Sequence, residues 1–172
     1  EQTRGFFLRG FGWYQPLGDY VDMQILGDWF SKGSWGAQLG SNYNWRYHFK
    51  GNMTFNYNLN DFDDDTIPGS KQFKWVWNHR QDAKANPTQT FSANVNFSSS
   101  GFDKSNSYNV NEKLTGQKSS SISYTKNWAG TPFNFSMSAN AKQNITDSTV
   151  TLDMPTGAFN VSTIYPFRSK ES

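Results

Sequence analysis

Strict alternation of polar and apolar residues runs through the segment 46–60. Every second residue is polar, and those between are apolar or aromatic apart from one glycine. Successive side chains of a β-strand point to opposite faces, so the pattern predicts one strand between two different environments. The apolar set is Tyr47, Phe49, Gly51, Met53, Phe55, Tyr57 and Leu59, and the polar set is Arg46, His48, Lys50, Asn52, Thr54, Asn56, Asn58 and Asn60.

The same alternation returns in other segments, which turn-forming residues separate. The clearest segments are 21–29, 35–44, 73–78, 91–98 and 133–141, and the weaker ones lie around 122–124, 150–152 and 159–161. Turn signals rich in glycine, proline, serine and aspartate occur at 16–19, 31–34 and 129–132. No segment has helical periodicity. We therefore predict an all-β fold, an antiparallel meander of about ten strands.

The length of the strands and the placement of aromatic residues favour a membrane wall over a soluble sheet. An outer-membrane strand needs ~9–11 residues, whereas globular strands usually have ~5–6. Aromatic residues make up 17% of the chain, and those near strand ends resemble the girdles of membrane barrels. Trp29, Trp35, Trp45, Tyr47 and Trp77 have this position. The sequence thus predicts a segment of a large transmembrane β-barrel.

Composition excludes several other classes. No run approaches the ~18 apolar residues of a membrane-spanning helix, and a mean hydropathy of −0.78 suits strands that are apolar at alternate positions only. The net charge is +2, and no clustered basic face suggests nucleic acid as a partner. Because the chain has no cysteine, it forms neither a disulfide framework nor a thiolate metal site.

Two long links, 61–71 and 101–117, follow the fourth and sixth expected strands, so both should lie at one end of the sheet. Outer-membrane barrels have long loops outside and short turns in the periplasm. The first strand would then run inward, whereas the first strand of such barrels normally runs outward. We therefore interpret residues 1–172 as one barrel segment of a longer protein.

The alternation assigns individual residues to the two sides of the wall. The expected lipid-facing residues are Tyr47, Phe49, Met53, Phe55, Tyr57, Leu59, Phe73, Trp75 and Trp77. The expected lumen-facing residues are Arg46, His48, Lys50, Asn52 and Lys74. Of these, Arg46, Lys50 and Lys74 are either ordinary lumen charges or contacts for lipid phosphates, because cations bind phosphate strongly.

No group of residues suggests catalysis. His48 and His79, the only two histidines, are expected on the polar side of a strand or in a turn, with no acid or nucleophile at a suggestive spacing. We therefore expect no enzyme activity and no cofactor. An acidic cluster is formed by Asp61, Asp63, Asp64 and Asp65. Clustered carboxylates can bind divalent cations, but we favour a solvated surface loop as the interpretation of this cluster.

Several motifs resemble the lipopolysaccharide-assembly outer-membrane protein family, LptD, in its Bacteroidetes branch. The most specific is NHRQDAKANP at 78–87, followed by FSANVNF at 91–97. The others are RGFFL at 4–8, DYVD at 19–22, GD at 27–28, SKGSWG at 31–36, SNY at 41–43 and IYPF at 164–167. The resemblance covers most of the chain.

The resemblance implies a function in transport without bond chemistry. Members of the family have a periplasmic jelly roll and a large barrel in the bacterial outer membrane. A plug lipoprotein of the LptE type fills the lumen, a periplasmic bridge supplies lipopolysaccharide, and barrel-assembly machinery inserts the barrel among outer-membrane lipid. By resemblance this chain is an early wall segment of the translocon that inserts lipopolysaccharide into the outer leaflet.

The resemblance also implies a gate. In better-known members prolines weaken the first strands, where lipid leaves sideways. This sequence has Gly10 and Gly12 at the matching place, and glycine also weakens a strand.

The alternative that the residues leave open is a soluble, aromatic-rich β-sandwich that binds carbohydrate, with Phe55 and Tyr57 in a dry core between two sheets.

Overall fold

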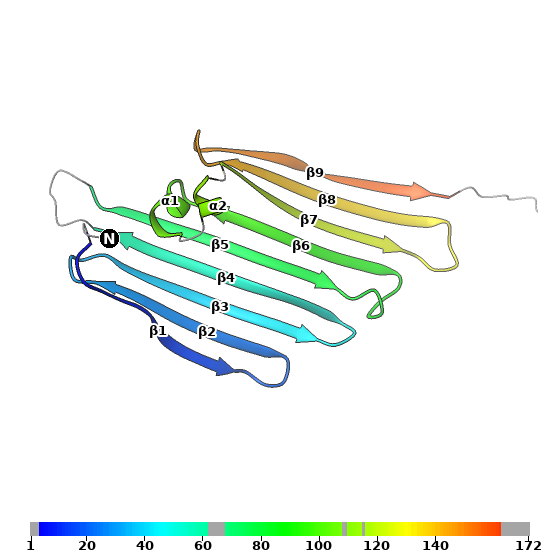
Figure 1. Ribbon diagram of the computed structural model, residues 1–172. Helices are drawn as coiled ribbons and strands as arrows, with labels where there is room; N and C mark the ends of the chain where they lie inside the picture. The colour runs from blue at the N-terminus through cyan, green and yellow to red at the C-terminus, as the bar shows by residue number, and fades with distance from the viewer. Residues whose placement is uncertain (1–3, 62–67, 108–109, 115, 163–172) are drawn as a thin grey trace, which may run out of the picture.

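The computed structural model describes residues 4–61, 68–107, 110–114 and 116–162, and it contains one antiparallel sheet (Figure 1). Nine strands follow one another in chain order, each paired with the next. They are β1 (Phe7–Pro16), β2 (Val21–Phe30), β3 (Trp35–Trp45), β4 (Phe49–Asn60), β5 (Ser70–Gln81), β6 (Gln89–Ser98), β7 (Gln117–Asn127), β8 (Phe133–Asn144) and β9 (Thr149–Val161). The expected all-β antiparallel meander is confirmed.

The strands differ from the expectation in detail. The two weak segments 150–152 and 159–161 belong to one strand, β9, whose register against β8 shifts between Ser138 and Asn140. The shift interrupts the alternation, which is why the sequence suggests about ten strands. The strand expected at 46–60 begins at Phe49, because residues 46–48 form the turn from β3. Tyr47 there has a φ of 62°, which is outside the extended region.

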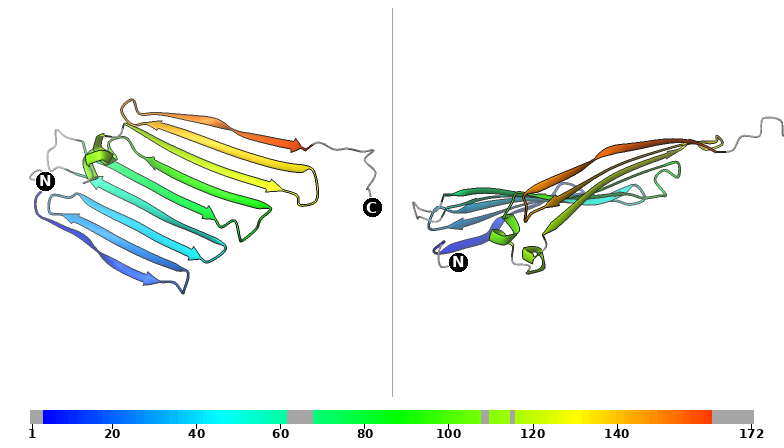
Figure 2. Two further views of the ribbon diagram at one scale, coloured as in Figure 1. Left: turned by 45° about the vertical axis from the view of Figure 1, so that its right-hand side comes forward. Right: turned by 90° about the horizontal axis from the view of Figure 1, so that it is seen from above.

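Two short helices, which the sequence did not predict, interrupt the long link between β6 and β7. They are α1 (Phe102–Asn106) and α2 (Val110–Leu114). Each has five residues, which is too few for a helical period to appear in the sequence. Both helices lie on one side of the sheet (Figure 2). No helix in the described part of the chain is long and apolar enough to cross a membrane.

Cross-strand partners pair odd-numbered residues with odd-numbered ones from β2 to β6, so the sheet has two consistent faces. The apolar face holds, for example, Leu39, Phe55, Trp75 and Phe97 in one row across four strands. We call the opposite side, with the even-numbered residues of these strands, the polar face. The described residues form no second sheet, and the layer is single (Figure 2). This disagrees with the β-sandwich alternative.

The two ends of the sheet differ. The short-turn end carries the connections 17–20, 46–48, 82–88 and 128–132, and the long-loop end carries the links that follow β2, β4, β6 and β8. The links after β4 and β6 therefore share one end, as predicted. Most buried side chains also lie there. They are Arg4, Phe30, Ser34, Asn60, Gln72, Ser98, Phe102, Asp103, Lys118, Gln143 and Ile145.

Candidate functional site

The polar face consists of rows of amide and hydroxyl side chains. One row runs across five strands through Asn42, Asn52, Asn78, Asn94 and Ser121. The Asn78 side chain donates to Asn52 Oδ1 at 3.3 Å. Such side chains keep hydrogen-bonding capacity for water or a polar ligand. The face can therefore border an aqueous lumen or contact the sugars of an amphiphile.

The expected lumen-facing residues fall into separate groups. Lys50, Asn52 and Lys74 are on the polar face, as their register partners show. Arg46 and His48 are not on a strand, because they belong to the turn between β3 and β4. The imidazole Nδ1 of His48 lies 3.0 Å from the carbonyl oxygen of Arg46.

Lys74 does not contribute a free charge to the polar face, because α1 lies over it. Its Nζ is 3.0 Å from Asp103 Oδ1, and Lys118 Nζ is 2.5 Å from Asp103 Oδ2. Asp103 is 3% exposed and the two lysine side chains 12% and 6%. Lys118 Nζ also donates to Ser98 Oγ at 2.6 Å. We call Lys74, Asp103 and Lys118 the buried ion group; it attaches α1 to the polar face.

Side chains from β7 and β8 satisfy the end of β6 beside the buried ion group. Backbone pairing between β6 and β7 covers only Gln89–Asn94. Beyond it, the Asn96 N–H donates to Ser120 Oγ at 3.0 Å, and the Ser98 N–H donates to Gln143 Oε1 at 3.2 Å. The Gln143 amide also donates to the Ser98 carbonyl. The end of β6 is thus satisfied by side chains rather than by a neighbouring backbone.

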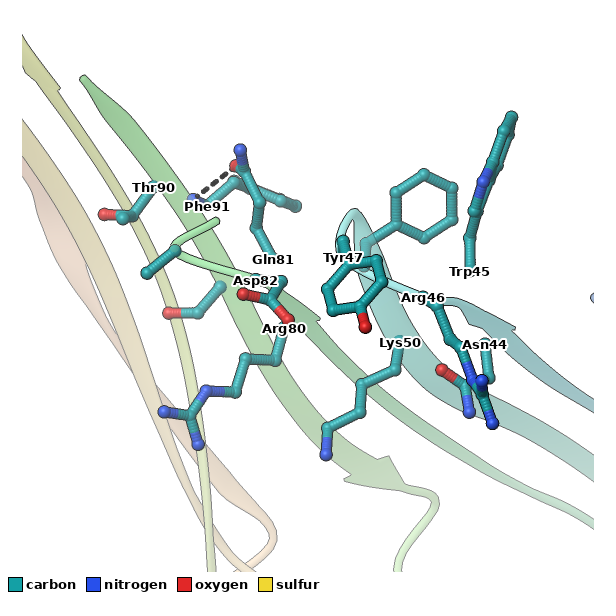
Figure 3. A pocket seen from close by; sticks show the side chains of 13 residues that line it. Asn44, Trp45, Arg46, Tyr47, Lys50, Arg80, Gln81, Asp82, Thr90 and Phe91 are labelled. Carbon is teal, nitrogen blue, oxygen red and sulfur yellow. Dashed lines mark hydrogen bonds between the residues drawn. The ribbon is translucent and has the colours of Figure 1, made fainter. Parts of the chain in front are cut away.

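A second basic group lies at the short-turn end of the polar face. Lys50 and Arg80 are direct cross-strand partners on β4 and β5, and Arg46 extends toward the same side from the turn (Figure 3). All three residues are exposed. They line a hollow of about 820 Å3 together with Asn44, Asp82, Thr90 and Ser92. The sequence-based set missed Arg80, although it continues the even-numbered series of β5.

The apolar face carries the expected lipid-facing residues of β4 and β5. Tyr57 is opposite Phe73, Phe55 opposite Trp75, and Met53 opposite Trp77. Large exposed side chains on this face include Ile25, Trp29, Trp35, Leu39, Trp45, Phe55, Trp75, Ile122, Phe133, Met137 and Phe159. Tyr47 is also exposed, at 62%, but it is in the turn and its side is not set by strand alternation.

Aromatic rings form a belt on the apolar face along the short-turn end. Tyr20 stacks on Trp45 with centroids 5.4 Å apart, and Trp45 contacts Phe49 at 5.9 Å. Farther along this end Phe133 stacks on Phe159 at 5.7 Å. Rings at this level of a sheet are typical of the girdle at a membrane–water interface.

His79 belongs to this belt, so its expected place on the polar side or in a turn is wrong. It lies on β5 opposite Gly51 and Ala93, and its Nδ1 is 2.9 Å from the Tyr43 hydroxyl. Trp77 donates its indole N–H to the same hydroxyl at 2.9 Å. Because the Tyr43 oxygen accepts from Trp77, its own proton can be donated to Nδ1.

The expected gate strand, β1, pairs with β2 through one irregularity. Its register shifts between Leu8 and Phe11, and Gly10 in this bulge has a φ of 65°. A β carbon at Gly12 would lie 1.9 Å from the carbonyl oxygen of Ile25, so only glycine fits there. Bulges and glycines both interrupt a ladder.

The acidic link lies mostly outside the described residues. Asp61 is described; its backbone N–H donates to Ser34 Oγ at 2.8 Å. Asp63, Asp64 and Asp65 are not among the described residues. Within the described ranges, no group of three or more histidine or acidic side chains could hold a metal ion.

We compared the chain with protein families, curated proteins and solved structures. No curated protein and no solved structure matches it. The model of the family described as LptD protein matches residues 1–172, which is the whole chain. Members of this family are outer-membrane proteins of lipopolysaccharide transport, and the antiparallel strands of 10 to 13 residues are long enough for an outer-membrane wall. The chain belongs to the LptD protein family.

Proposed function

We propose that this chain is part of the barrel wall through which lipopolysaccharide reaches the outer leaflet, and that it performs no bond chemistry. One observation carries the proposal. A single nine-stranded layer has an aromatic and aliphatic face and an opposite face of asparagine, serine, threonine and charged side chains. A wall between lipid and an aqueous lumen needs these two faces.

The orientation follows from the two ends of the sheet. Long loops of outer-membrane barrels are outside and short turns are periplasmic, so the short-turn end faces the periplasm. Lipopolysaccharide from a periplasmic bridge then enters at this end. The amide rows border its polar part, together with a plug lipoprotein in the lumen.

The sheet needs further strands to become a barrel. Within the described residues β1 pairs only with β2, and β9 only with β8. Open edges pair readily with other strands. The remaining strands of the barrel, joined with the help of barrel-assembly machinery, supply those partners. The bulge at Gly10 and the close approach at Gly12 make β1 the proposed gate strand.

Two adjacent cysteine substitutions on β4 test the wall. Phe55 is on the apolar face, and Asn56, its neighbour, is on the polar face opposite Lys74. The chain has no cysteine of its own. In the full-length protein in outer membranes, we expect Asn56→Cys to react with a water-soluble maleimide at least about tenfold faster than Phe55→Cys, because lipid shields the latter. A lipid-soluble maleimide should reverse the preference.

The two positions are one residue apart and so at nearly the same depth, which makes each the control of the other. Labelling after denaturation establishes that both thiols are intact. Fast aqueous labelling of Phe55→Cys, or the reverse preference, would contradict a wall with lipid on the apolar face.

A further inference from the structure

We propose that Arg46, Lys50 and Arg80 form a binding site for phosphate groups at the short-turn end of the polar face. The inference rests on the proposed function, in which a phosphorylated amphiphile passes this end. It adds the specific site and the chemical group recognised there.

Two like charges face each other at the centre of the site. Lys50 on β4 is the direct partner of Arg80 on β5, and like charges in that relation repel. Arg46 in the adjoining turn brings a third cation to the same side (Figure 3). An anion bound between them would turn the repulsion into attraction.

The rest of the protein does not supply that anion in the described structure. None of the three cationic side chains forms a hydrogen bond or ion pair with a described residue. Two carboxylates lie close by, Asp22 beside Arg46 and Asp82 in the lining of the hollow, and neither forms an ion pair with the three cations. Asp22 accepts from the backbone and side-chain nitrogens of Asn42 at 3.0 Å, and Asp82 accepts from the Lys84 N–H at 2.9 Å.

At the long-loop end the protein itself supplies the counter-charge of two lysines. There Lys74 and Lys118 share the buried carboxylate of Asp103. At the short-turn end three exposed cations surround an open hollow that holds one carboxylate, Asp82, which is paired with none of them. The contrast indicates that the counter-ion of Arg46, Lys50 and Arg80 comes from outside the chain.

The donors around the hollow match a phosphate. Arginine presents a planar fork for two phosphate oxygens, and lysine adds a compact charge. The Asn44 amide lines the same hollow and adds a neutral donor. The Thr90 and Ser92 hydroxyls, also at its lining, lie 2.9 and 2.7 Å from the hydroxyls of Thr125 and Ser123. A phosphate monoester carries about −1.5 to −2 charges at neutral pH, which three cations can balance.

The test uses the full-length protein in detergent with fluorescent lipopolysaccharide and the same lipid after enzymatic removal of its phosphates. We compare the wild type, Lys50→Gln, Arg80→Gln and the double variant. Lys142→Gln is the matched control, because Lys142 is an exposed cation on the polar face at the long-loop end. Circular dichroism and heat-dependent gel mobility establish that each variant is folded. Arg80→Lys retains the charge if Arg80→Gln fails to fold.

We expect the double variant to bind the phosphorylated lipid about tenfold more weakly, which corresponds to the loss of about one charge-assisted contact. Lys142→Gln should bind like the wild type. The dephosphorylated lipid should bind all folded proteins equally, and as weakly as the double variant binds the phosphorylated form. Arg80→Lys should give an intermediate affinity, because it loses the fork but retains the charge.

Three outcomes would overturn the inference in different ways. If the wild type binds phosphorylated lipid tightly and the double variant does too, the site is wrong while the proposed function stands. If inorganic phosphate alone binds as tightly and with the same dependence on Lys50 and Arg80, the ligand is the free ion and not the amphiphile. If the wild type binds neither form of the lipid, the proposed function itself fails.

Discussion

At the residue scale, Tyr43 illustrates what alternation predicts and what it leaves open. Its odd number places it on the apolar face, as expected. Its hydroxyl contacts with Trp77 and His79 depend on the register of three strands, in which Gly51 lies opposite both Tyr43 and His79. A β carbon at Gly51 would lie 2.4 Å from the Tyr43 oxygen. Sequence spacing contains no such register. The side of His79, however, follows from alternation alone, because His79 continues the odd-numbered series of Trp75 and Trp77; its polarity led to the wrong assignment.

Replacing Tyr43 by phenylalanine tests this cluster. The change leaves the Trp77 N–H and the His79 Nδ1 without their shared partner. We expect the free energy of unfolding in detergent to fall by about 1–2 kcal/mol. Tyr57→Phe is the control, because Tyr57 is on the same face and its hydroxyl bonds no described residue. Equal effects of the two changes on urea-induced unfolding would refute the hydrogen-bonded role of Tyr43.

The basic residues of the polar face also show which features the sequence predicts and which it does not. Lys50 could be placed on the polar face from its even number, and Arg46 was placed there although it is in a turn. Lys74 was expected to be an available lumen charge, but the link between β6 and β7 brings Asp103 onto it. That contact joins residues 29 positions apart. No local sequence pattern predicts this contact, so the sequence could not distinguish the ion-paired Lys74 from the exposed Lys50.

At the element scale, strands were predictable and helices were not. Each clear period-two segment corresponds to a strand, because successive side chains of a strand point to opposite faces and alternation gives each face its own kind of residue. The ends of strands were less predictable. The sequence 46–48 continues the alternation of β4 yet forms a turn, since the tight connection to β3 overrides the pattern there. The helix α1 depends on contacts with the polar face rather than on a period of its own.

The attachment of α1 leads to a prediction about Asp103→Asn. Removing the carboxylate leaves Lys74 and Lys118 close together without their shared counter-ion. Breaking a buried pair in this way costs about 3–5 kcal/mol. We expect α1 to detach from the polar face, with faster amide hydrogen exchange across 102–107 and at the β6 residues 96–98.

The control for this prediction is Lys104→Gln, which changes an exposed charge on the same helix. It should leave exchange at 96–98 unchanged. Unchanged exchange in Asp103→Asn would mean that α1 is held by the burial of Phe102 rather than by the buried ion group.

At the scale of the whole molecule, the sheet has little interior. The buried apolar residues within the described ranges are Phe30, Ala93, Val95, Phe102 and Ile145. Many large side chains remain exposed on the apolar face, and burying each one fully would contribute about 1.5–3 kcal/mol. A second layer within the described chain does not provide this burial. We expect lipid or detergent to provide it, so that the single layer is stable only with such a partner.

This requirement can be measured on the 172-residue chain alone. In plain buffer we expect no folded monomer, because the apolar face and the free edges of β1 and β9 associate with other copies. In detergent micelles or lipid vesicles, the circular dichroism of β-strands should appear. Emission from the seven tryptophans should shift to shorter wavelength and be quenched by brominated lipid.

The tryptophans separate insertion from surface adsorption. Trp75 is on the apolar face near the middle of β5, so its emission should be quenched by lipid brominated deep in the acyl chain. Trp45, at the short-turn end of the same face, should be quenched more strongly by lipid brominated near the headgroup. Two variants give the comparison, one with Trp75 as its only tryptophan and one with Trp45 as its only tryptophan. A folded monomer in buffer whose tryptophan emission is not quenched by brominated lipid would mean that the apolar face is covered by protein. The membrane-wall proposal would then be wrong.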